Sequence, residues 1–170
     1  MVPLTPSISC ICRPCTSLGP EASARAFVQA PPLSLVLCSD RLSPPEIPEV
    51  LVHELTHVFD LSRNLDFGVC EDLAFSEVRA ARDAECAFRA SAPHPLLAAC
   101  AALPPGGAGE PGGLPPPLAG AAGALCKHLL GRCVRGKAGR ATDILFPGEG
   151  GGCVARVFER AMGDVEPREI

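Results

Sequence analysis

The sequence predicts a single, mainly helical α+β domain with a short sheet ahead of its first helix. Three observations favour this fold class. The chain has 170 residues and is 47% apolar, which is enough for one core of ordinary size. A short apolar run at 33–38 has the composition of a strand and precedes four segments that favour helices. The 17 Gly and 19 Pro are too few for a wholly disordered chain.

Composition argues against two classes of partner. The 15 basic and 19 acidic residues give a net charge of −4, which does not suit a nucleic-acid binder. No uninterrupted apolar run approaches the ~18 residues that a membrane-spanning helix needs. Residues 1–30 also lack the apolar core of a secretory signal peptide. We therefore expect no transmembrane segment and no nucleic-acid partner.

Ten cysteines are the strongest departure from average composition. Their even number and scattered positions are typical of a disulfide framework in an oxidising compartment. The alternative is a structural zinc site, for which Cys12-Arg-Pro-Cys15 and the neighbouring Cys10 are the candidates. A zinc ribbon needs a second Cys-x-x-Cys pair, which the chain lacks, so disulfides are favoured.

The chain divides into a short N-terminal segment and a main domain. Residues 1–31 contain cysteines and several prolines, and we expect this segment to be rich in turns. The main domain is expected at 32–170, and the strand at 33–38 is its first element. The organisation therefore places a small sheet directly ahead of the first helix.

The first helix has a recognisable start. Ser43 and Glu46 have the spacing of a capping box, and Pro44 falls at the first helical position. Pro48 could instead open the helix itself, since Pro is tolerated in the first turn. Either start predicts a helix from about Pro48 to Ser62.

Three further helices are expected. Acidic residues favour the start of the second helix at about Glu71, and we expect it to continue to about Ala90. A Pro/Gly-rich stretch at 104–117 has almost nothing to bury and predicts a flexible insertion. Helices then follow at about 119–134 and 153–162, and Gly163 ends the last one.

The segment at 53–57 reads His-Glu-Leu-Thr-His and lies within the first predicted helix. Residues four apart stack on one helix face, so His53 and His57 can reach the same metal ion. Glu54 lies beside them and would act as a general base toward a water molecule. Two ordinary core histidines would instead leave this carboxylate buried without a partner, which is costly. The motif therefore predicts a catalytic zinc site.

A catalytic zinc ion needs a third protein ligand and one open position. Glu77 lies in an apolar stripe of the second predicted helix, where a carboxylate is costly unless a cation pairs with it. Asp60 shares a helix face with His53 and His57, but a hydrogen bond to a histidine is its milder role. His94 lies between two prolines and is the third candidate. Glu77 is the favoured ligand and Asp60 the alternative.

The group that would stabilise an oxyanion is less clear, because the chain has no Tyr. The candidates are His94, His128 and Arg79. We expect Arg79 on the polar face of its helix with Arg82 and Asp72, where a solvated salt bridge is its ordinary role. None of the three candidates is preferred.

Several segments resemble the Atp23 family of mitochondrial metalloproteases. They are Val-Leu-Cys at 36–38, VHELTHVFD at 52–60, SEVRAA at 76–81, Cys-Val-Arg at 133–135 and VFERAMGDVEP at 157–167. Cys12, Cys15 and Cys86 also match cysteines of that family. The string HELTH occurs in thermolysin-like enzymes too, whose third ligand is a Glu on a following helix, and this likeness supports Glu77.

The resemblance implies a zincin-like protease domain at 32–170, with His53 and His57 as zinc ligands and Glu54 as the catalytic base. It implies a zinc endopeptidase of the mitochondrial intermembrane space, peripheral to the inner membrane. The implied substrate is an inner-membrane protein precursor, the presequence of an ATP synthase subunit, and the family also assists ATP synthase assembly. The alternative is a non-proteolytic assembly chaperone or interaction module with the same fold. We expect the edge of the strand at 33–38 to pair with an extended substrate.

Overall fold

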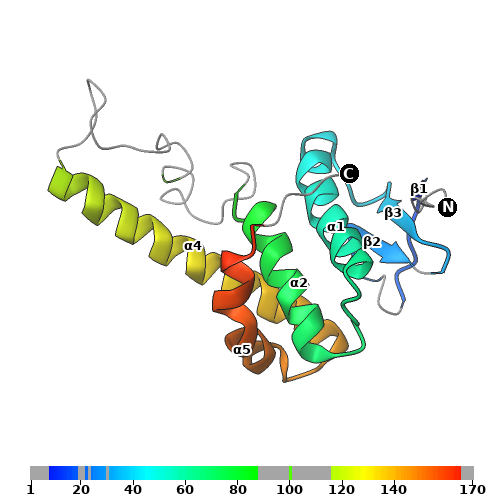
Figure 1. Ribbon diagram of the computed structural model, residues 1–170. Coiled ribbons are helices and arrows are strands. Elements are labelled where there is room, and N and C mark those ends of the chain that lie inside the picture. The colour runs from blue at the N-terminus through cyan, green and yellow to red at the C-terminus, as the bar shows by residue number, and fades with distance from the viewer. Residues whose placement is uncertain are drawn as a thin grey trace, which may run out of the picture.

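The computed structural model describes residues 8–18, 22, 24–29, 31–87, 100 and 116–165. Within these residues the fold is α+β, with a small sheet on one side of a group of helices (Figure 1). The elements are β1 (Ser9–Arg13), β2 (Ala26–Gln29), β3 (Ser34–Cys38), the 3₁₀ helix η2 (Pro44–Glu46), α1 (Ile47–Ser62), α2 (Cys70–Asp83), α4 (Pro116–Leu145) and α5 (Gly150–Gly163).

The sheet has the strand order β1-β3-β2. β3 runs parallel to β1 and antiparallel to β2, with Ile11 and Phe27 both in register with Val36. The predicted strand at 33–38 is confirmed, and two strands that the sequence did not predict, β1 and β2, come from the turn-rich segment 1–31. β1 is mostly exposed, so its pairing depends on the backbone of β3 rather than on a buried face that a sequence pattern would reveal. The expected boundary at residue 31 lies inside this sheet.

The predicted capping box precedes α1. The Ser43 N–H donates a hydrogen bond to Glu46 Oε2 at 3.0 Å, and η2 leads directly into α1. Pro48 lies in the first turn of α1, where its missing N–H costs nothing. The prediction of a helix at 48–62 is confirmed, with a start one residue earlier.

Two predicted helix ends are wrong. α2 ends at Asp83 rather than Ala90, because Ala84 leaves helical dihedrals (φ −108°, ψ −96°) and a turn follows through residue 87. α4 runs to Leu145 rather than Val134, because its second half buries side chains against α2 and α5. The last two residues of the expected insertion, 116 and 117, are helical, and its remainder at 104–115 lies outside the described residues.

The main core lies between α2, α4 and α5. Val78 of α2, Val134 and Ala138 of α4 and Phe158 of α5 are buried in it. The predicted helix at 153–162 is confirmed within α5, and its apolar face points into this core. Figure 1 shows α1 between α2 and the sheet, so α1 joins the two parts of the fold.

Four disulfide bonds connect these elements. They are Cys15–Cys38, Cys70–Cys153, Cys86–Cys133 and Cys100–Cys126. Cys10 and Cys12 are exposed free thiols on β1, so the disulfide framework accounts for eight of the ten cysteines. The alternative zinc site loses one of its three candidate ligands, because Cys15 is bonded to Cys38. Within the described residues, no helix is long and apolar enough to cross a membrane.

Candidate metal centre

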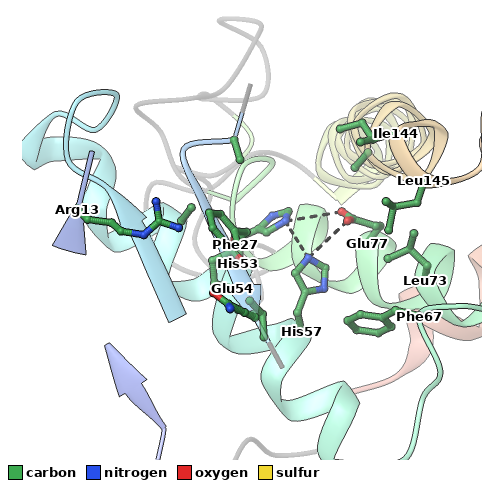
Figure 2. A pocket seen from close by; sticks show the side chains of 15 residues that line it. Arg13, Phe27, His53, Glu54, His57, Phe67, Leu73, Glu77, Ile144 and Leu145 are labelled. Atoms are coloured by element: carbon green, nitrogen blue, oxygen red, sulfur yellow. Dashed lines mark hydrogen bonds and ion pairs between the residues drawn. The ribbon is translucent and has the colours of Figure 1, made fainter. Parts of the chain in front are cut away.

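α1 and α2 bring His53, His57 and Glu77 to one point. The two histidines lie one turn apart on α1, and their Nε2 atoms are 3.0 Å from each other. Glu77 extends from α2, with Oε1 at 3.5 Å from His57 Nε2 and Oε2 at 3.7 Å from His53 Nε2. Figure 2 shows the three side chains pointing toward one another. The fold therefore brings together the two histidines of the motif on α1 and the glutamate that the sequence analysis favoured on the second helix.

These three residues fit a small divalent cation. Ligand atoms ~2.1 Å from one ion in a tetrahedral arrangement lie about 3.4 Å apart, close to the separations between these donors. Glu77 Oε2 is buried and has no hydrogen-bond partner, as expected for an atom that serves as a ligand. Among the described residues, His53, His57 and Glu77 form a group whose ligand atoms all lie within 4.8 Å of one another.

The other ring nitrogen of each histidine is also held. His53 Nδ1 lies 3.0 Å from Glu85 Oε2, and His57 Nδ1 lies 2.8 Å from Ser76 Oγ. Ser76 in turn hydrogen-bonds Asp60. Such contacts fix the tautomer and ring orientation of a metal-binding histidine. The sequence analysis did not single out Glu85 or Ser76. Glu85 lies between Ala84 and Cys86, so, like Glu77, it is a carboxylate next to small apolar residues and could have been recognised in the same way.

Burial and charge shift the pKa values in this cluster. Burial raises the pKa of Glu77 to about 7 and that of Glu54 to about 7. For His53 the effect of burial is outweighed by the hydrogen bond to Glu85 and by the nearby carboxylates, which raise its pKa to about 9. Burial, with a contribution from the charge on His53, lowers the pKa of His57. The carboxylates around His53 therefore favour a positive charge within the cluster.

Glu54 shares a cavity with the three converging side chains. The cavity has a volume of about 710 Å³ and lies between β2 and the last turn of α4. Glu54 is nearly buried, with 6% of its surface exposed, yet it lines this cavity beside His53 and His57. A carboxylate there is placed to exchange a proton with a molecule bound next to the metal centre.

Asp60, the alternative ligand, has a different partner. Its carboxylate forms a buried ion pair with Arg79, and both side chains are almost completely inaccessible to solvent. The expectation of a solvated Arg79 on the polar face of α2 is wrong, because α1 packs over that face and Phe59 and Phe75 flank the guanidinium. Asp60 reaches His57 indirectly, through Ser76.

The two described candidates for the oxyanion stabiliser, His128 and Arg79, do not line the cavity. His94 is outside the described residues. His128 is exposed on α4 and does not line the cavity, and Arg79 does not line it either. Within the described part of the chain, the basic residues that line this cavity are Arg13 and the metal-centre histidines. None of the three oxyanion candidates is therefore placed beside the metal centre by the described structure.

Comparison with protein families gives one match. The model of the peptidase M76 family matches residues 4–98, which is more than half of the chain. The matched region contains the sheet, α1 and α2, and thus His53, Glu54, His57 and Glu77. Comparisons with curated proteins and with solved structures gave no match.

Proposed function

The chain belongs to the peptidase M76 family, the Atp23 family of metallopeptidases, and from that premise we propose that it is a zinc-dependent endopeptidase with a zincin-like fold. The observation that carries the proposal is the convergence of His53, His57 and Glu77 beside Glu54 in one cavity. Family membership supports a peptidase, and the name of the family implies a metal ion. The residue roles below are part of the proposal.

Zinc is the metal that the donor set suits best. Two imidazole nitrogens and one carboxylate oxygen, with a further position open to the cavity, are typical of hydrolytic zinc sites. His53, His57 and Glu77 would hold the ion, and Glu85 and Ser76 would orient the two rings. When bound, zinc polarises the scissile carbonyl and makes a water molecule more acidic.

Glu54 would carry the proton transfers. Its pKa of about 7 lies close to neutral pH, so the carboxylate can accept a proton from the attacking water and release it again. Glu54 would then give this proton to the amine nitrogen of the leaving peptide. Burial is what raises the pKa of Glu54, so the same environment that shields the reaction from bulk water also prepares the base.

The substrate backbone would pair with β2. The expectation that the strand at 33–38 offers a free edge is wrong, because β3 is paired on both sides. Within the described residues β2 pairs with β3 alone, and Ala26, Phe27, Val28 and Gln29 line the cavity. Adding an extended peptide to such an edge supplies backbone hydrogen bonds and presents alternate side chains to the cavity.

We further propose a mitochondrial setting for this activity. The resemblance described above supports a precursor of an inner-membrane protein as substrate, specifically the presequence of an ATP synthase subunit. It also supports the intermembrane space, peripheral to the inner membrane, as the location, together with a role in ATP synthase assembly. The four disulfide bonds suit an oxidising compartment.

Zinc analysis and peptide cleavage with the purified full chain test the proposed function. Glu54→Gln should keep about one zinc per chain and lose ~10²–10⁴-fold in turnover, because the proton acceptor is gone. His57→Ala should lose both zinc and cleavage. His128→Ala, which replaces an exposed histidine away from the cavity, is the matched control and should keep both.

Two results would contradict the proposal. Cleavage by Glu54→Gln at the wild-type rate would remove Glu54 from the mechanism. Full zinc content after replacement of both His53 and His57 would place the metal at the cysteines. If Glu54→Gln still supports ATP synthase assembly while precursor cleavage fails, the chaperone activity is a separate function of the same fold.

A further inference from the structure

One wall of the metal-centre cavity is apolar and partly exposed. Ile144 and Leu145, in the last turn of α4, are 58% and 53% accessible to solvent although both are large aliphatic residues. Both line the cavity, together with Phe67 and Leu73. Figure 2 shows Leu73, Leu145 and Ile144 on the side of the cavity where Glu77 lies. We call these four residues the apolar wall.

Core packing does not explain this exposure. α4 contributes Val134, Ala138 and Thr142 to the interior, and all three are fully buried. Ile144 and Leu145 lie two and three residues beyond the last of these and remain largely exposed. Apolar side chains gathered at a cavity rather than in the core are typical of a binding surface.

The apolar wall is continuous with the metal centre. The ring of Phe67 meets that of His57 edge-on, with 5.6 Å between their centroids. Leu73 lies one helical turn before Glu77 on α2, so it covers the same face of that helix. A group bound against the wall would therefore lie next to the proposed ligands.

The other side of the metal centre has opposite character. A smaller cavity of about 170 Å³ is lined by Arg25, Glu49 and Glu85, and it shares His53 and Glu54 with the larger one. Arg25 donates a hydrogen bond to Glu49 Oε1 at 3.1 Å, so this side is charged and polar. The smaller cavity is thus the more charged of the two, whereas a peptide in the larger cavity would meet Phe27 and Val28 of β2 as well as the apolar wall.

We propose that the apolar wall is the specificity subsite of the peptidase, and that it takes a large aliphatic or aromatic side chain from a substrate residue flanking the scissile bond. This inference rests on the proposed function. The side chain of Leu or Phe would remove exposed surface of Ile144 and Leu145 from water, whereas Ala would reach little of it and Asp would lose hydration. The expected preference for Leu or Phe over Ala is about 10- to 100-fold in kcat/KM.

A series of otherwise identical peptides tests the subsite. Each peptide carries Leu, Phe, Ala or Asp at the two positions that flank the scissile bond, and mass spectrometry maps the cleavage site. The double variant Ile144→Ser/Leu145→Ser should lose most of the preference, because cleavage of the Leu and Phe peptides should fall toward that of the Ala peptide. Leu125→Ser is the matched control, because Leu125 is on the same helix and 50% exposed but does not line the cavity.

A binding measurement separates the subsite from catalysis. The zinc-loaded Glu54→Gln protein should bind fluorescent Leu and Phe peptides at least ~10-fold more tightly than the Ala peptide, and adding Ile144→Ser/Leu145→Ser should abolish the difference. Cleavage without preference, or a preference that the double variant retains, overturns the inference and leaves the proposed function intact. Selective binding without cleavage by the wild-type protein overturns the proposed function and supports the subsite.

Discussion

The interface between α1 and α2 holds two buried acidic clusters that balance their charge differently. In the ion-pair cluster, Asp60 of α1 meets Arg79 of α2, so the carboxylate has a cation from the chain itself. In the metal cluster, defined as His53, His57, Glu77 and Glu85, the described ion pairs of the carboxylates are with histidines. The same two helices thus place a carboxylate beside an arginine in one cluster and beside imidazoles in the other.

The difference shows how one pair of helices can combine stability with function. A buried carboxylate needs a paired charge or a full set of hydrogen bonds. In the ion-pair cluster the paired charge comes from Arg79, although Asp60 Oδ2, like Glu77 Oε2, has no hydrogen-bond partner. In the metal cluster Glu77 faces two imidazole nitrogens instead of a guanidinium, and this donor set suits a divalent cation. The predictions below test this contrast.

The largest expected effect separates Glu77 from Asp60. Glu77→Gln should abolish turnover and weaken zinc affinity by more than ~100-fold, because a ligand is lost rather than a supporting contact. Asp60→Asn should reduce affinity or activity by ~10–100-fold at most, since Asp60 reaches His57 through Ser76. Competition with a chromogenic zinc chelator measures both affinities, and circular dichroism confirms that each variant is folded. Equal losses in the two variants would contradict the distinction between the clusters.

The next effect concerns stability rather than metal binding. Arg79→Met should lower the free energy of unfolding by ~3–5 kcal/mol, because it leaves the buried Asp60 with only the longer ion-pair contact to Arg63 at 3.8 Å. Asp60→Leu combined with Arg79→Met should recover most of that loss, since a buried ion pair can be replaced by apolar side chains at little cost. Urea unfolding of the zinc-saturated protein measures both values.

Arg156→Met is the matched control for this stability measurement. Arg156 forms an exposed ion pair with Glu71 at 2.8 Å, and such pairs contribute little in water. Its replacement should leave the unfolding midpoint nearly unchanged. A loss in Arg79→Met as small as that in Arg156→Met would show that the ion-pair cluster does not stabilise the α1–α2 interface.

The smallest effect is expected from the residues that orient the histidines. Glu85→Gln removes the charge beside His53 Nδ1, and Ser76→Ala removes the hydroxyl beside His57 Nδ1. Each should weaken zinc affinity by ~10–100-fold without removing a ligand. Isothermal titration calorimetry with zinc would detect the change, and an unaltered affinity in both variants would show that the ring contacts do not position the ligands.

The local part of the metal cluster could be predicted from the sequence. His53 and His57 lie four residues apart on a helix whose start is set by Ser43 and Glu46, so spacing alone placed them on one face. Glu77 was found because a carboxylate in an apolar stripe needs a partner. Each of these two predictions depends only on the residues of a single helix.

What the sequence did not reveal depends on contacts between elements. Arg79 looks solvated on an isolated helix, and α1 buries it only in the tertiary structure. Glu85 was assigned to the continuation of α2, whereas the turn after Asp83 directs it to His53. β1 depends on pairing with β3, and the connectivity of the cysteines follows from the fold rather than from their spacing.

X-ray absorption at the zinc edge tests the central claim most directly. The zinc-loaded full chain should show nitrogen and oxygen neighbours at ~2.0–2.2 Å from the metal and no sulfur. The zinc signal should be lost with the metal in His57→Ala and remain unchanged in His128→Ala. Sulfur neighbours at ~2.3 Å would place the zinc at the exposed thiols Cys10 and Cys12 and would contradict the assignment to His53, His57 and Glu77.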